Sequence, residues 1–111
     1  MMLGVGMDEI ETIPPENTEM AEIVMPAVAD LSAIALAHES LQQGLQRTRI
    51  EMDAAIVERI STAYIQLLLA AHAAAQLAGK EMRIIRSSEA LQNAFATLGL
   101  HESYKEMTSH A

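Results

Sequence analysis

Three short segments of the chain carry apolar patterns that are typical of β-strands. Residues 22–25 form an apolar run that ends at a proline, and residues 81–86 contain a second run with two consecutive isoleucines. Between them, residues 48–54 alternate, which places Ile50, Met52 and Ala54 on one side of a strand. We therefore expect three strands, of which the second along the chain buries one face.

Apolar residues recur at three- and four-residue spacing between these strands, which predicts helices. The first helix starts at residue 31, because Asp30 is a preferred N-capping residue, and it ends near Gly44. We expect its inward face to consist of Leu31, Ile34, His38, Leu41 and Leu45.

The second predicted helix, at residues 62–78, is rich in alanine and contains three consecutive leucines. Ala and Leu are strong helix formers, and a helix with almost no polar side is buried on most sides. Gly79 can adopt the left-handed conformation that ends it. A third helix starts after Ser87 or Ser88 and stops at Gly99, with Leu91, Ala94, Phe95 and Leu98 on its apolar face.

The order strand, helix, strand, helix, strand, helix predicts an α/β fold. Strands joined by helical crossovers form a mostly parallel sheet with right-handed connections. We expect a small sheet of this kind, covered by about three to four helices. An all-helical bundle is the alternative, but it requires residues 49–54 and 81–86 to be helical, against their alternation and their Ile-Ile pair.

The two ends of the chain differ from this alternating part. Residues 1–20 hold five acidic residues, no basic residue and the pair Pro14-Pro15, which does not fit inside a helix or a central strand. We expect an acidic, mostly flexible arm with a short edge strand near residues 7–13, or simply a disordered tail. Residues 21–111 then form the single domain that this chain length supports, with a polar, frayed tail from about residue 101.

Composition disfavours several classes of protein. The 111 residues include one Phe, two Tyr and no Trp, so the core is built from aliphatic side chains and alanine, which favours tight packing over a roomy ligand cavity. A net charge of −8 disfavours nucleic acids and anionic membranes as partners. No apolar run reaches the roughly 18 residues of a membrane span, and no secretory signal is recognisable. We expect a cytoplasmic protein, which the absence of cysteine fits.

Residues with catalytic or metal-binding chemistry are scattered along the chain. His38 and His72 fall on different predicted helices and have no ligand partner at helical spacing, so we expect no metal site. The sequence contains no nucleophile motif, glycine-rich phosphate loop or metalloprotease motif. Asp53, at the end of a predicted strand, would suit an enzyme site, but such an Asp more often caps a turn or faces water. We expect no catalytic residues, no cofactor and no enzyme activity.

The middle of the chain resembles one known family. Residues 57–71, VERISTAYIQLLLAA, resemble the signature segment of STAS domains, the anti-sigma-factor antagonist domains, which include the small STAS subunit of a lipid-asymmetry ABC transporter. Residues 78–85, AGKEMRII, are similar to the strand that follows in that family, and residues 88–91 and 98–100 to its final helix. The resemblance covers about residues 22–100 and implies a STAS-like fold.

The resemblance also implies a regulatory site. STAS domains carry Asp-Ser/Thr-Ser/Ala-Gly before the Leu-rich helix, whereas this chain has Ser61 in place of Asp and Tyr64 in place of Gly. Because Ala63 stands where sigma-factor antagonists are often phosphorylated, a phosphorylation switch falls to Thr62 or, second, to Ser61. A hydroxyl at a helix N-terminus also caps the helix, for ~1 kcal/mol. A plain N-cap is therefore the alternative interpretation of either residue.

The function that the resemblance implies is protein binding. A small STAS regulator binds an anti-sigma factor or a serine kinase-like partner in bacterial partner switching, and we expect Arg59, Ser61, Thr62 and Tyr64 to form the partner surface. Tyr64 is a candidate interface anchor if it is exposed. The alternative is a STAS subunit that binds the ATPase of a lipid-transport ABC complex and needs no phosphate. The sequence sets no oligomeric state.

Overall fold

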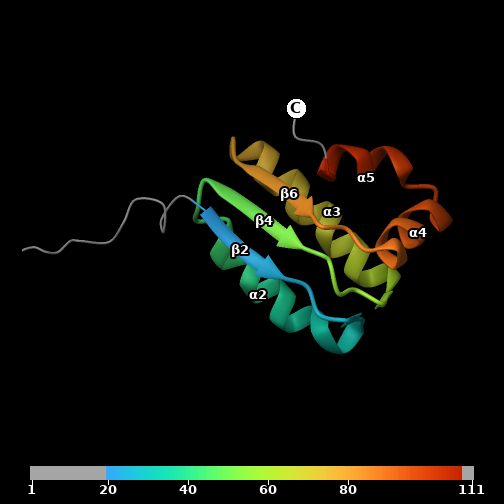
Figure 1. Ribbon diagram of the computed structural model, residues 1–111. Helices are drawn as coiled ribbons and strands as arrows, with labels where there is room; N and C mark the ends of the chain where they lie inside the picture. The colour runs from blue at the N-terminus through green and yellow to red at the C-terminus, as the bar shows by residue number, and fades with distance from the viewer. Residues whose placement is uncertain (1–19, 109–111) are drawn as a thin grey trace, which may run out of the picture.

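The computed structural model of the protein describes residues 20–108 and centres on a three-stranded parallel sheet with the order β2-β4-β6 (Figure 1). Its strands are β2 (Met20–Val24), β4 (Arg49–Asp53) and β6 (Glu81–Ile85). Their parallel pairing confirms the predicted α/β arrangement. Because residues 49–53 and 81–85 are strands, the helical-bundle alternative is wrong.

A second, two-stranded parallel sheet follows the carboxyl ends of β2 and β4 and was not predicted. It consists of β3 (Val28–Ala29) and β5 (Arg59–Ile60), with Val28 beside Arg59 and Ala29 beside Ile60. Strands of two residues are too short to give a recognisable alternation in a sequence. This small sheet joins the segment after β2 to the segment that leads into the next helix.

Helices alternate with the strands as predicted. They are α2 (Ile34–Gly44), α3 (Thr62–Leu77), α4 (Glu89–Thr97) and α5 (His101–Thr108), and a 3-10 turn, η1 (Leu31–Ala33), leads into α2. The Asp30 side chain accepts the N–H of Ser32 and caps η1, and Ser88 accepts the N–H of Leu91 and caps α4. These bonds confirm the prediction that Asp30 is a cap. They also show that Ser88, rather than Ser87, caps the third predicted helix.

The three-stranded sheet has one apolar and one polar face. Strand register places Ile50 between Ala21 and Met82, and Met52 between Ile23 and Ile84, so these residues share the face that packs against the helices. Figure 1 shows α2 and α3 behind the strands and α5 alongside β6. The opposite face, turned toward the viewer, carries charged side chains and is here called the outer face.

The inward face of α2 differs from the predicted one. Leu31 is 72% exposed and His38 is also exposed, whereas Ala37, Leu41 and Gly44 are buried. Leu31 is out of phase because it lies in the 3-10 turn, whose residues follow a tighter helical period than those of α2. Small residues face the sheet here, which lets α2 approach it closely.

Helix α3 is buried on one face only, so the prediction of burial on most sides is wrong. Its buried residues are Tyr64, Ile65, Leu68, Ala71 and Ala75. Leu77 is 91% exposed, and most of the remaining alanines are on the solvent side. Alanine is favourable in a helix whether or not it is buried, so its abundance reports helix propensity rather than burial.

For residues 101–108 the prediction of a frayed tail is wrong, because the chain forms α5 there. The helix follows Gly99, which has a positive φ of 73°. Met107 is fully buried, and the ring of Tyr104 packs against Phe95 with centroids 5.6 Å apart. The Tyr104 hydroxyl also donates to Ser87 Oγ at 2.9 Å. The mostly polar helix α5 is therefore held against the core by the side chains of Tyr104 and Met107.

The predicted acidic arm and its edge strand near residues 7–13 lie outside the described residues. Met20, which was assigned to the arm, begins β2. Within residues 20–108, none of the helices combines the length and the apolar character needed to cross a bilayer.

Candidate functional site

Ser61 is the N-cap of α3. Its backbone is extended (φ −86°, ψ 158°), and its Oγ accepts the backbone N–H of Tyr64 at 3.1 Å. Its own N–H donates to the Ala29 carbonyl at 2.9 Å, which ties the cap to β3. The hydroxyl therefore satisfies one of the free amides at the helix start, as the capping interpretation predicts.

Thr62 is the first residue of α3 and is exposed. The free N–H groups of a first helical turn and the helix dipole favour an anion at this end. A phosphate on Thr62 is therefore compatible with the helix. Of the two predicted phosphorylation candidates, Thr62 is accessible, whereas Ser61 is half-buried and engaged as the cap.

Tyr64 points into the core. Its side chain is 1% exposed, and burial raises the pKa of its hydroxyl above the ordinary value. It is in helical phase with Leu68, Ala71 and Ala75, the buried stripe of α3. The interpretation of Tyr64 as an interface anchor required an exposed side chain and is wrong.

Arg59 lies at the surface, in the strand that precedes Ser61. In the small sheet, Ala29 is fully buried and Ile60 packs against the core, so the paired residues Val28 and Arg59 point the other way, toward solvent. Val28 is 38% exposed. The two strands thus bring one apolar and one cationic side chain together beside the start of α3.

Asp30 supplies a negative charge near Arg59. The hydroxyl of Ser32 donates to Asp30 Oδ1 at 2.6 Å. This hydrogen bond, with a smaller contribution from the charge of Arg59, holds the pKa of the Asp30 carboxyl below its ordinary value of 3.8. A cation and an anion close enough to interact therefore lie together in this part of the surface.

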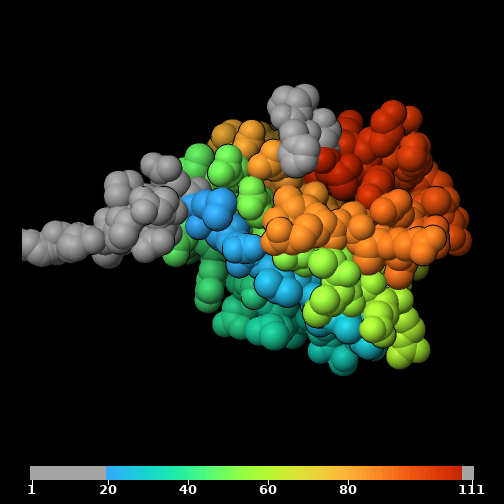
Figure 2. Space-filling view, in the orientation of Figure 1, coloured from blue at the N-terminus to red at the C-terminus, as the bar shows by residue number. Residues whose placement is uncertain are grey.

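Two large apolar side chains are exposed in the same region. Leu31 lies in η1, and Ile56, which is 55% exposed, lies in the loop between β4 and β5. The Glu58 N–H donates to the Ala27 carbonyl at 2.7 Å, which joins this loop to the segment that leads into η1, and Figure 2 shows the two segments in yellow-green and cyan. Sequence reasoning missed both residues, since Leu31 was predicted to face inward and no pattern marks Ile56 as exposed. We call Val28, Leu31, Ile56, Arg59 and Thr62 together the docking surface.

Other features of the described chain lie away from the docking surface. A groove of about 200 Å³ follows β2 and α2, and a second of about 470 Å³ lies between α3 and α5. Among residues 20–108, no three His, Cys, Asp or Glu side chains are grouped as metal ligands. The docking surface itself offers an exposed, partly apolar contact area with one accessible hydroxyl.

A protein-family model described as "Mlab, STAS domain" matches residues 23–108. The matched region begins within β2 and ends with the last residue of α5, so it spans almost all of the described fold. Comparison with curated proteins and with solved structures gave no match.

Proposed function

Because the chain belongs to the STAS family, whose domains generally mediate protein–protein interactions, we propose that it is a regulatory protein that binds a signalling partner. The partner is an anti-sigma factor or a serine kinase-like protein of a bacterial partner-switching pathway. Binding takes place at the docking surface, and phosphorylation of Thr62 controls it. The proposal assigns the protein no catalytic step and no cofactor.

The observation that carries the proposal is the exposed Thr62 at the start of α3, which follows the strand pair that places Arg59 beside the exposed Val28. A phosphate adds a charge of about −1.5 to −2. The helix N-terminus tolerates this charge, so the fold persists while the contact area becomes strongly anionic. A partner that packs on Leu31 and Ile56 would then lose affinity, because the phosphate must be desolvated beside them.

Incubation with the candidate kinase, followed by mass spectrometry, tests the proposal. We expect one phosphate on Thr62 in the wild type and none in Thr62→Ala. Thr97→Ala, which alters an exposed threonine at the end of α4, is the matched control and should be phosphorylated normally. The phosphorylated protein should bind its partner at least about tenfold more weakly. Phosphorylation that persists in Thr62→Ala would remove Thr62 from the mechanism. An affinity for the partner that is the same with and without the phosphate would do so too.

The apolar part of the docking surface favours a second candidate, a STAS subunit that binds the ATPase of a lipid-transport ABC complex. Contact through Leu31 and Ile56 needs no phosphate, and the Ser61 hydroxyl is engaged as a cap. Stable co-purification with an ATPase subunit, unchanged in Thr62→Ala, would support this candidate over the first. Co-purification that is lost on phosphorylation of Thr62 would argue for the first.

A further inference from the structure

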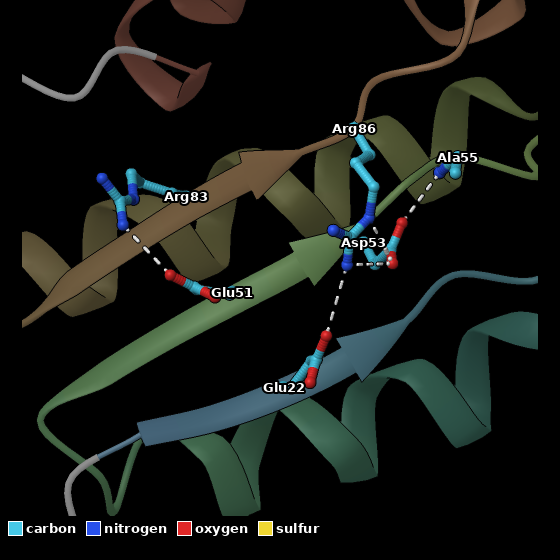
Figure 3. A network of polar contacts seen from close by, with 6 residues as sticks. All are labelled: Glu22, Glu51, Asp53, Ala55, Arg83 and Arg86. Carbon is cyan, nitrogen blue, oxygen red and sulfur yellow. Dashed lines mark hydrogen bonds and ion pairs between the residues drawn. The ribbon is translucent and has the colours of Figure 1, made fainter.

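Arg86 joins all three strands of the main sheet on its outer face (Figure 3). Its Nε and Nη2 donate to Asp53 Oδ2 at 2.9 and 2.7 Å, and Nη2 lies 3.5 Å from Glu22 Oε2. Glu22 is in β2, Asp53 ends β4 and Arg86 directly follows β6. One guanidinium therefore connects the end of β6 to the two strands beside it.

The Asp53 carboxylate has a second contact that leads to the docking surface. Its Oδ1 accepts the backbone N–H of Ala55 at 3.0 Å, in the first turn of the loop between β4 and β5. This loop carries Ile56 and continues into Arg59. One oxygen of Asp53 thus binds Arg86, and the other fixes the start of the segment that presents two residues of the docking surface.

Arg86 has an unusual backbone conformation, with a φ of 51°. This left-handed region is favoured by glycine and disfavoured for a long L side chain. Hydrogen bonds hold the backbone on both sides of it, from the Ala54 N–H to the Ile85 carbonyl at 3.0 Å and from the Ser88 N–H to the Ala54 carbonyl at 3.2 Å. An arginine where glycine would be easier points to a role for its side chain.

We propose that Asp53 and Arg86 are a positioning pair, which holds the loop at residues 54–58 so that Ile56 and Arg59 are presented beside Thr62. The consequence for partner binding rests on the proposed function, whereas the effect on the loop does not. The Arg86 side chain acts from the outer face, through the carboxylate of Asp53.

Amide hydrogen exchange followed by NMR tests the pair on the protein alone. Asp53→Asn keeps an oxygen that can accept the Ala55 N–H but removes the charge that binds Arg86. We expect the amides of Ala55 and Glu58 to exchange about tenfold faster in this variant, while the Met52 amide in the centre of the sheet keeps its wild-type rate. Such a local change separates positioning from general loss of stability.

Glu51→Gln is the matched control. Glu51 lies two residues earlier in β4, on the same face, and its Oε2 accepts a hydrogen bond from Arg83 Nη2 at 3.0 Å (Figure 3). Its loss should change the exchange of the loop far less than Asp53→Asn does, because Glu51 bonds to Arg83 and Arg49 and acts on Arg86 through its charge alone. The double variant Asp53→Asn/Arg86→Gln should loosen the loop no more than either single change does.

Substitutions of Arg86 itself complete the test. Arg86→Gly keeps the left-handed backbone and removes the side chain, so the loop should exchange as in Asp53→Asn, while Arg86→Lys should restore part of the protection. Wild-type loop exchange in Arg86→Gly, or equal acceleration in Glu51→Gln, would overturn the proposal. Failure of every candidate partner to bind the wild type would count against the proposed function and not against the positioning pair.

Discussion

The two neighbouring hydroxyls at the start of α3 have different surroundings. Ser61 Oγ is bonded to a backbone amide of the first turn, whereas Thr62 is one residue further on and exposed. The difference follows from helix geometry, since the extended N-cap residue places its side-chain oxygen within reach of the free amides of the second and third helical residues. A capping role for Ser61 and a regulatory role for Thr62 are therefore compatible.

Ser61→Ala should lower the free energy of unfolding by about 1 kcal/mol, because the Tyr64 N–H loses its acceptor. Urea unfolding followed by circular dichroism measures the change. Ser61→Asp, which restores the acid typical of the family, should be at least as stable as the wild type, since Asp is a good cap and its charge suits the helix N-terminus. A larger loss in Thr62→Ala than in Ser61→Ala would contradict the assignment of the cap.

Asp53 should make the stability of the protein depend on pH. Hydrogen bonds from Arg86 and then from the Ala55 amide hold the pKa of the Asp53 carboxyl below its ordinary value of 3.8. A lowered pKa in the folded state stabilises the protein above pH 3.8, and this contribution disappears as the pH falls through the lower, folded-state value. Wild type and Asp53→Asn should therefore differ in free energy of unfolding near neutral pH and converge in strong acid. A difference that persists in strong acid would show that the charge is not its source.

The elements of the fold were predictable to different degrees. The three main strands and helices α2 to α4 follow from local periodicity, and the caps Asp30, Ser61 and Ser88 follow from residue type at the boundaries. The strands β3 and β5 are too short to show an alternation of apolar and polar residues. Helix α5 has a mostly polar sequence, in which Tyr104 and Met107 face the core. Such elements form through tertiary contacts that a single local pattern does not encode.

Met107→Ala should destabilise the protein by about 2–5 kcal/mol, because it removes a fully buried side chain and leaves a cavity between α5 and the core. Thermal unfolding gives the change in stability, and circular dichroism at low temperature shows whether the helix content falls with it. Glu106→Ala, at the exposed neighbouring position, should change stability by no more than about 0.5 kcal/mol. Equal effects of the two variants would mean that α5 is not held by its buried face.

The candidate site depends on how the entire fold comes together. Ser61, Thr62 and Arg59 were identified through the family resemblance, and the structure places all three around the start of α3. Tyr64 was misplaced because the inward phase of α3 is set by packing against the sheet. Leu31 and Ile56 could not be predicted to be exposed, since apolar residues in loops and short 3-10 turns are exposed or buried according to tertiary contacts.

Leu31→Ser and Ile56→Ser should each weaken partner binding by about tenfold or more, because a Leu or Ile side chain buried by the partner contributes about 1.5–3 kcal/mol. Calorimetric titration with the candidate partner measures the loss. Leu77→Ser, at the far end of α3, changes a side chain that is 91% exposed and is the matched control, which should bind as the wild type does. Equal losses in all three variants would place the partner elsewhere. All three should fold normally, since none removes a buried group.

The contrast between the apolar face and the ion-paired outer face of the sheet has a consequence for the response to salt. Added salt of any kind shortens the Debye length, about 8 Å under physiological conditions, and weakens exposed ion pairs such as Arg86–Glu22 at 3.5 Å and Arg49–Glu81 at 3.9 Å. Sulfate, unlike chloride, is also excluded from protein surfaces and so strengthens the burial of apolar groups. Chloride and sulfate solutions of equal ionic strength therefore act alike on the outer face and differently on the inner one. At a fixed ionic strength, replacing chloride by sulfate should therefore change the free energy of unfolding mainly through the apolar packing beneath the strands.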